Sequence, residues 1–67
     1  MRQETGSVIR KARQRKRMTQ EQLAAQLGVD RSAVSNWERG QHYPLRYAGA
    51  VEEILGIELP EPQAAAS

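Results

Sequence analysis

Residues 19–40, TQEQLAAQLGVDRSAVSNWERG, constrain the fold more than any other stretch of the chain. Thr19 followed by Gln22 three residues later is typical of a capping box, in which each side chain satisfies an open amide at a helix start. Apolar residues then recur at helical spacing, so one face of this segment is expected to be buried. Gly28 stands where a left-handed residue closes a helix without a Cβ clash. The pattern predicts a short helix that ends in a tight turn.

The residues after this turn predict a second short helix, over 30–39. Asp30 is a favoured N-cap residue, and Val34 and Trp37 lie three positions apart on the face that should be buried. A tryptophan can also stack on single-stranded bases, but its spacing from Val34 favours a role in the core. Polar side chains fall on the opposite face: Ser32, Ser35, Asn36 and Arg39. Such a helix is suited to contacting base edges in the major groove of DNA.

A chain of 67 residues forms one domain with a small core. It contains no cysteine, which excludes a disulfide, a thiolate zinc site and a thiol nucleophile. Its single histidine, His42, has no second histidine or cysteine with which to share a metal. The sequence shows no catalytic constellation, and its few aromatics leave little room for a cofactor or small-molecule cavity. The polar start and the lack of a long apolar window predict a cytoplasmic protein without a membrane partner.

The charge is unevenly distributed, although the net charge is only +2. Residues 50–67 hold four glutamates and no basic side chain. Residues 1–17 hold one glutamate and seven basic side chains: Arg2, Arg10, Lys11, Arg13, Arg15, Lys16 and Arg17. This polarity predicts a basic end that meets phosphates and an acidic end that points away from them. A solvated helix face, or favourable charge at the end of a helix over residues 7–17, is the alternative interpretation of the basic run.

The spacing across residues 19–44 resembles the helix-turn-helix of the phage-repressor/Cro family, also called the xenobiotic-response-element-like family. The similarity covers roughly residues 7–57. The residues that carry it are Gln20, Leu23, Ala24, Gly28, Val29, Val34, Trp37, Glu38, Gly40 and Pro44. The resemblance implies an all-α, compact, lambda-repressor-like domain of four to five helices over residues 7–59. A flexible arm over 1–6 and a short disordered tail over 60–67 are expected to flank it.

The resemblance implies contacts to DNA bases from four residues of the second helix: Arg31, Ser32, Ser35 and Asn36. Arginine is the commonest donor to the O6/N7 edge of guanine, but Arg31 could equally hold a phosphate. Asn36 could make the bidentate contact to adenine, and Ser35 could reach a base or a phosphate.

Phosphate contacts are expected from five side chains: Gln20, Arg39, Gln41, His42 and Arg17. In the family, the glutamine that matches Gln20 binds a backbone phosphate and braces the start of the reading helix; an exposed glutamine without a partner is the alternative. The loop 40–44 should add its backbone amides. Arg17 stands where many relatives have glycine or asparagine, so its turn is expected to carry slight strain.

The resemblance also implies a structural clamp, an ion pair between Arg13 and Glu38 that ties the first helix to the end of the third. Removing one partner of such a pair would strand the other charge. An ordinary exposed arginine is the alternative.

The last helical region is expected over residues 45–55. The segment is about one residue shorter than the common family pattern, which would give a merged or kinked helix. Ile57 and Leu59 could then cover the core or form a dimer seam.

These observations favour a sequence-specific regulator of transcription that binds a double-stranded DNA operator. It would be a Cro/repressor-type protein of a phage, prophage or bacterium, on the nucleoid, and a homodimer at least on DNA. The alternative is a protein-interaction module, an antitoxin or adaptor/coactivator, that uses its apolar and acidic C-terminal end.

Overall fold

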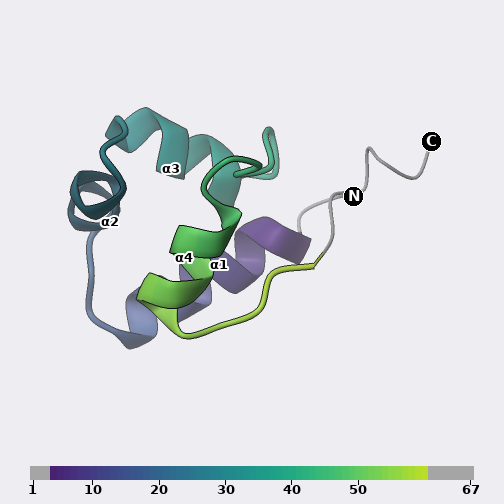
Figure 1. The fold of residues 1–67 in the computed structure, drawn as a ribbon, viewed down its shortest axis with the longest axis horizontal. Helices are drawn as coiled ribbons and strands as arrows, with labels where there is room; N and C mark the ends of the chain where they lie inside the picture. Colours follow the sequence, from purple (N-terminus) through teal and green to yellow (C-terminus); the bar gives the residue numbers. More distant parts are fainter. Residues whose placement is uncertain (1–3, 61–67) are drawn as a thin grey trace.

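The computed structural model describes residues 4–60 of the chain. This range contains four helices joined by turns and loops: α1 (Glu4–Arg15), α2 (Gln20–Leu27), α3 (Arg31–Glu38) and α4 (Ala48–Leu55). No strand occurs in this range, which confirms the predicted all-α class (Figure 1). The longest of the described helices has 12 residues, and a bilayer span needs about 20. The expected tail over 61–67 and the start of the expected arm, 1–3, lie outside the described residues.

Helix α1 begins at Glu4, so the prediction of a helix start at Ser7 was wrong. Glu4 supplies an acidic first turn, and basic residues occupy the last turn, as the helix dipole favours. Gly6, which was expected in the arm, is buried within the helix instead. Its burial shows that the first turn of α1 packs against the rest of the domain.

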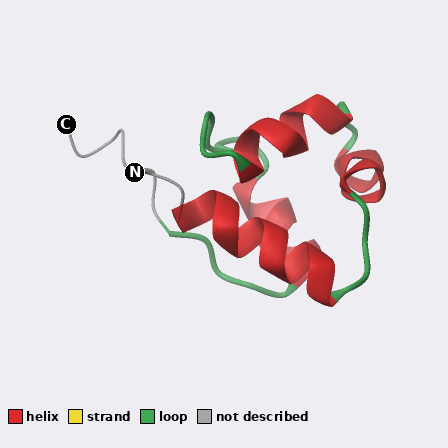
Figure 2. Ribbon diagram, turned by 180° about the vertical axis from the view of Figure 1, so that it is seen from behind, coloured by secondary structure: helices red, strands yellow, loops and turns green. Residues whose placement is uncertain are grey.

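Helices α2 and α3 cross with α2 seen nearly end-on, while α3 lies in the plane of the view (Figure 2). The predicted capping box is present, because Thr19 accepts from the Gln22 amide at 3.0 Å and the Gln22 side chain accepts from the Thr19 amide at 2.9 Å. Gly28 ends α2 with φ 74°, a left-handed conformation that suits glycine. Asp30 occupies the N-cap position of α3, but its side chain makes no capping hydrogen bond.

All four helices contribute to one core. Its buried apolar residues are Ile9, Ala12, Leu23, Ala24, Val34, Trp37, Val51 and Leu55. Trp37 is 5 % exposed and its ring centroid lies 6.0 Å from that of Tyr47, so the core interpretation of this tryptophan is correct. Helix α1 contacts both α3 and α4, and α3 also contacts α2, so α1 and α3 together connect the four helices.

The C-terminal part departs from the expected helix over 45–55. Residues 45–47 form a turn, and α4 starts only at Ala48. Beyond the helix, Ile57 and Leu59 pack against the core of their own chain. The Leu59 amide donates to Glu52 at 2.8 Å, and the Tyr43 hydroxyl donates to the Pro60 carbonyl at 2.7 Å. Of the two interpretations of Ile57 and Leu59, the structure favours a cover for the domain's own core.

Candidate nucleic-acid interface

Helix α3 has one face in the core and one toward solvent. Val34, Trp37 and Glu38 are buried on the inner face. The four predicted base contacts share the outer face at positions i, i+1, i+4 and i+5: Arg31, Ser32, Ser35 and Asn36. The first two are exposed and the last two are half-buried. The structure therefore brings these four side chains together on a surface that a groove of DNA could cover.

Two of the predicted contact residues are joined to each other. The Arg39 Nη2 donates to the Asn36 Oδ1 at 2.8 Å. Because a guanidinium can only donate, this bond fixes the carbonyl end of the Asn36 carboxamide toward Arg39. The amide end of Asn36, which carries two donors, then points away from Arg39.

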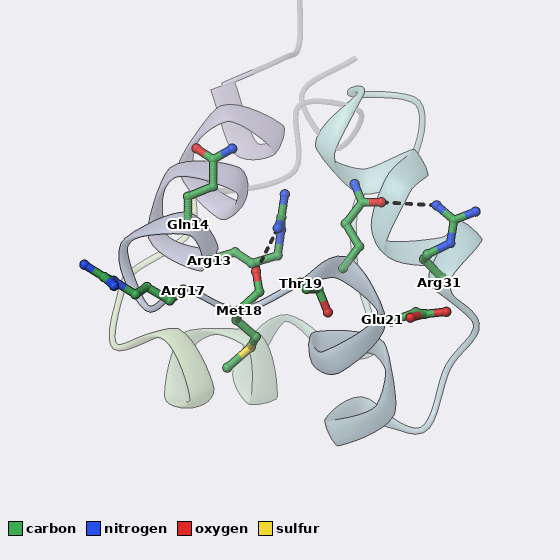
Figure 3. A pocket seen from close by; sticks show the side chains of 8 residues that line it. Arg13, Gln14, Arg17, Met18, Thr19, Glu21 and Arg31 are labelled. Atoms are coloured by element: carbon green, nitrogen blue, oxygen red, sulfur yellow. Dashed lines mark hydrogen bonds between the residues drawn. The ribbon is translucent and has the colours of Figure 1, made fainter.

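The pair expected between Arg13 and Glu38 is present in bidentate form. Arg13 Nε lies 2.6 Å from Glu38 Oε2, and Arg13 Nη2 lies 3.1 Å from Glu38 Oε1. The third guanidinium nitrogen, Nη1, donates to the Met18 carbonyl at 2.8 Å (Figure 3). The side chains are only 11 % and 3 % exposed, so the pair is shielded from water. Charge-assisted bidentate pairs of this kind are among the strongest hydrogen bonds in proteins.

Gln20 extends this ion pair toward the outer face of α3. Its Nε2 donates to Glu38 Oε1 at 3.0 Å. Its Oε1 accepts from Arg31 Nη1 at 3.4 Å, the bond drawn as the dashed line to Arg31 in Figure 3. A continuous chain of hydrogen bonds thus runs from Arg13 through Glu38 and Gln20 to Arg31. The clamp network, as we call these four residues, links α1, the start of α2 and both ends of α3.

A basic depression lies beside the clamp network, between the end of α1 and the start of α2. It has a volume of about 510 Å³, and Arg13, Arg17 and Arg31 contribute to its lining together with Glu21. Arg17 and Arg31 flank it on opposite sides (Figure 3). The first residues of α2 also line it, and the amide end of a helix favours anions. The depression therefore has the charge and the donors to receive a phosphate group.

The backbone of Arg17, which lines the depression, adopts an unusual conformation. Its φ is 57°, and it is the one non-glycine residue with positive φ among residues 4–60. The expected strain in this turn is therefore present, since the left-handed region is costly for residues with a Cβ.

The loop after α3 offers fewer backbone donors than expected. Gly40 adopts φ 78°, as predicted for the residue that ends the helix. The Gly40 amide donates to the Trp37 carbonyl at 3.1 Å, and the Gln41 amide donates to the Asn36 carbonyl at 2.9 Å. The prediction that the loop amides would hold phosphates is wrong for these two, because they close the helix. The side chains of Gln41 and His42 are exposed.

Gly6 is a structural residue that the sequence analysis missed. A Cβ on Gly6 would lie 2.6 Å from the Trp37 carbonyl oxygen and still closer to that of Glu38, so only glycine fits. Since Glu38 is in the clamp network, this contact sets how closely α1 approaches the end of α3. The available signal was a lone glycine inside a helical stretch, which often marks a close approach.

Within residues 4–60, no group of three or more His, Cys, Asp or Glu side chains could hold a metal ion. The arrangement of α3, the clamp network and the basic depression is that of a binding surface for a polyanion.

Comparison with known proteins agrees with this geometry. Residues 9–61 match the model of the helix-turn-helix family HTH_3. The HTH-type transcriptional activator BcrR of Enterococcus faecalis is 53 % identical over 36 residues, which cover 54 % of this chain and 18 % of BcrR. An HTH-type transcriptional regulatory protein of Halobacterium salinarum is 37 % identical over 57 residues, covering 85 % of this chain and 18 % of the relative.

A third relative, an HTH-type transcriptional regulatory protein of Methanoculleus marisnigri, is 36 % identical over 69 residues, covering 87 % of this chain. The chain spans 18 %, 18 % and 23 % of the lengths of these three relatives. The family match covers most of the chain, from within α1 to beyond the end of α4. This protein therefore belongs to the Cro/C1-type helix-turn-helix family of DNA-binding regulators of transcription.

Proposed function

We propose that the protein binds a specific double-stranded DNA operator by laying α3 in the major groove. The observation that carries this proposal is the division of α3 into a fixed inner face and a polar outer face, with Arg31, Ser32, Ser35 and Asn36 together on the latter. The N-terminal residues of a recognition helix contact bases in this kind of docking. Arg31 and Ser32 stand at that end.

Arg31 is the residue with the largest expected share of base discrimination. Its bond to Gln20 is 3.4 Å long, beyond the usual range for a strong N–H···O bond, so exchanging it for a base costs little. A bidentate bond from arginine to guanine contributes about 1–3 kcal/mol of discrimination. Asn36 offers its amide donors to the neighbouring base, because its carbonyl already accepts from Arg39.

Gln20 is suited to hold a phosphate while it stays in the clamp network. Its amide nitrogen carries two hydrogens, and the Glu38 bond uses one of them. The second can be donated to a phosphate oxygen at the rim of the basic depression. Arg17 from the same rim, with Arg39, Gln41 and His42 from the far end of α3, would complete the phosphate contacts.

The regulator would act as a homodimer on a two-fold operator, in the cytoplasm and on the nucleoid, and would repress by blocking polymerase. Cro/repressor-type proteins of phages or prophages fit this charge pattern. The relatives are several times longer, so an additional segment in a longer chain could alter the sign of regulation. A protein-interaction role, as an antitoxin or adaptor, is the alternative, supported by the exposed Glu53 and Glu58 near the C-terminal end.

Selection of bound duplexes from a random pool, at near-physiological salt, tests the proposal. We expect an enriched motif, whose preference at one base position disappears in Arg31→Ala. Affinity should fall steeply with salt, because phosphate contacts release counterions. If no motif is enriched and a protein partner co-purifies with the chain, the regulator proposal is wrong and the interaction role takes its place.

A further inference from the structure

The side chain of Asn36 is held at its carbonyl end by the protein itself. Arg39 Nη2 lies 2.8 Å from Asn36 Oδ1, which is a short, charge-assisted hydrogen bond. The two residues are three positions apart, the spacing at which side chains meet on one face of a helix. Asn36 is half-buried, so its carboxamide has less freedom than one at a fully exposed position. The protein therefore sets which end of the carboxamide faces outward.

The end of α3 also fixes the backbone from which both side chains project. The Gln41 amide donates to the Asn36 carbonyl at 2.9 Å. The Gly40 amide donates to the Trp37 carbonyl at 3.1 Å, and Gly40 has φ 78°. Together these features form a Schellman motif, in which Arg39 is the C-cap residue. The relative position of Arg39 and Asn36 is thus determined by the closure of the helix.

The orientation of the carboxamide decides which base edge it can match. An asparagine that is free to turn suits adenine, because it donates to N7 and accepts from the N6 amino group. In this chain the oxygen faces the Arg39 guanidinium, which can only donate. An adenine amino group brought to the same oxygen would meet a second donor beside it. The outward end of Asn36 is a nitrogen with two hydrogens, and guanine presents two acceptors in the major groove, N7 and O6.

We infer that Arg39 is a positioning residue that makes Asn36 select guanine rather than adenine. The inference rests on the proposed function and deepens it, because it names the class of base at one position of the operator. Arg39 need not touch that base, since it acts through the Asn36 oxygen. Without Arg39, the carboxamide is free to turn over and to accept from the amino group of adenine.

Duplexes that differ at a single base pair test this selection. The relevant position is the one whose base preference disappears in Asn36→Ala. At that position we expect guanine to bind about tenfold more tightly than adenine. Inosine, which keeps N7 and O6, should bind like guanine, and 7-deazaguanine, which lacks N7, should bind less tightly. In Arg39→Ala the ratio of the guanine and adenine affinities should fall to about one or reverse.

Arg17→Gly is the matched control for this ratio. It removes an exposed arginine that is proposed to hold a phosphate and that has no part in the Asn36 bond. It should lower the affinity for the guanine and adenine duplexes by the same factor. Loss of a phosphate contact in Arg39→Ala also lowers both affinities equally, so only the ratio reports the positioning of Asn36. Thermal unfolding establishes that both variants are folded.

Nuclear magnetic resonance of the protein alone gives a readout that does not depend on DNA. The order parameter of the Asn36 side-chain nitrogen should fall in Arg39→Ala and stay the same in Arg17→Gly. An unchanged value in Arg39→Ala overturns the inference, even where random-pool selection enriches no motif and the proposed function has failed separately. An enriched motif overturns the inference and leaves DNA binding intact in three cases. These are adenine at the Asn36 position, no position that depends on Asn36, or a guanine preference that survives in Arg39→Ala.

Discussion

The inner and outer faces of α3 are parts of the same eight-residue helix, but they are held in different ways. On the inner face, Val34 and Trp37 are packed in the core, and the Glu38 carboxylate accepts from two other helices. On the outer face, Arg31 and Asn36 make single hydrogen bonds at the surface. The comparison predicts that the position of α3 and its DNA preference depend on separate residues. Changes on the inner face should alter stability, and changes on the outer face should alter the preferred DNA sequence.

The largest expected effect comes from Glu38→Ala. It leaves the Arg13 guanidinium shielded from water without a counter-charge, and it removes the acceptor of Gln20. Loss of one partner of a buried pair costs about 3–5 kcal/mol. The free energy of unfolding, measured by urea titration followed by circular dichroism, should fall by that amount. Glu58→Ala, at an exposed glutamate, should change it little. An unchanged melting temperature for Glu38→Ala would show that the clamp network does not stabilise the fold.

The next largest effect is a difference in stability between alanine substitutions at two glycines. Gly6→Ala places a Cβ against the carbonyls of Trp37 and Glu38, and overpacking of this kind costs about 1–3 kcal/mol. Gly49→Ala meets open space and, at the second residue of α4, should stabilise the helix by less than the about 1 kcal/mol expected of an interior position. Thermal unfolding of the two variants at low protein concentration compares them directly. If both substitutions raise the melting temperature, α1 is free to move away from α3 and the close contact is unimportant.

On the outer face, Arg31→Ala should lower discrimination at one base position by about 1–3 kcal/mol. Its melting temperature should stay near that of the unchanged protein, because Arg31 is exposed and its bond to Gln20 is long. Competition binding with duplexes that differ at single positions, at fixed salt, measures the effect. A uniform loss across all duplexes would instead assign Arg31 to a phosphate.

The smallest effect is expected for Arg17→Gly. This change sharpens the comparison because it should alter both the stability of the turn and the affinity for DNA. Glycine relieves the strain of a Cβ at φ 57°, about 1–2 kcal/mol, and its larger loss of chain entropy offsets about half of this, so the turn should be stabilised by about 0.5–1 kcal/mol. The same change removes a phosphate contact, so affinity should fall equally for all sequences and the salt slope should drop by about one. A change in the preferred sequence would contradict this assignment.

Local signals in the sequence were sufficient to predict the helices around the turn. The capping box of Thr19 and the left-handed Gly28 depend on neighbours only a few residues away, and both are present. The start of α1 was not found in this way. Gly6 packs on the carbonyls of Trp37 and Glu38, about thirty residues further along the chain, and a lone glycine can mark a close approach without showing which residues it meets.

In the candidate site, too, some features follow from local sequence and others depend on how the helices pack. The spacing of Arg31, Ser32, Ser35 and Asn36 put them on one face in advance, since helical periodicity determines it. Family resemblance pointed to the pair of Arg13 and Glu38 and to Gln20 as a brace for the start of the reading helix, but not to the Gln20–Glu38 bond that joins the two. Side-chain hydrogen bonds between separate helices depend on how the helices pack, and the sequence does not specify that directly.

The clamp network also has a consequence for motion. Because the single Glu38 carboxylate joins α1, the start of α2 and the end of α3, none of these elements can open alone without losing a charge-assisted bond. Backbone amides in α3 should then exchange with deuterium only when the whole domain unfolds. A helix that is already this rigid has little conformational entropy left to lose when it enters a groove.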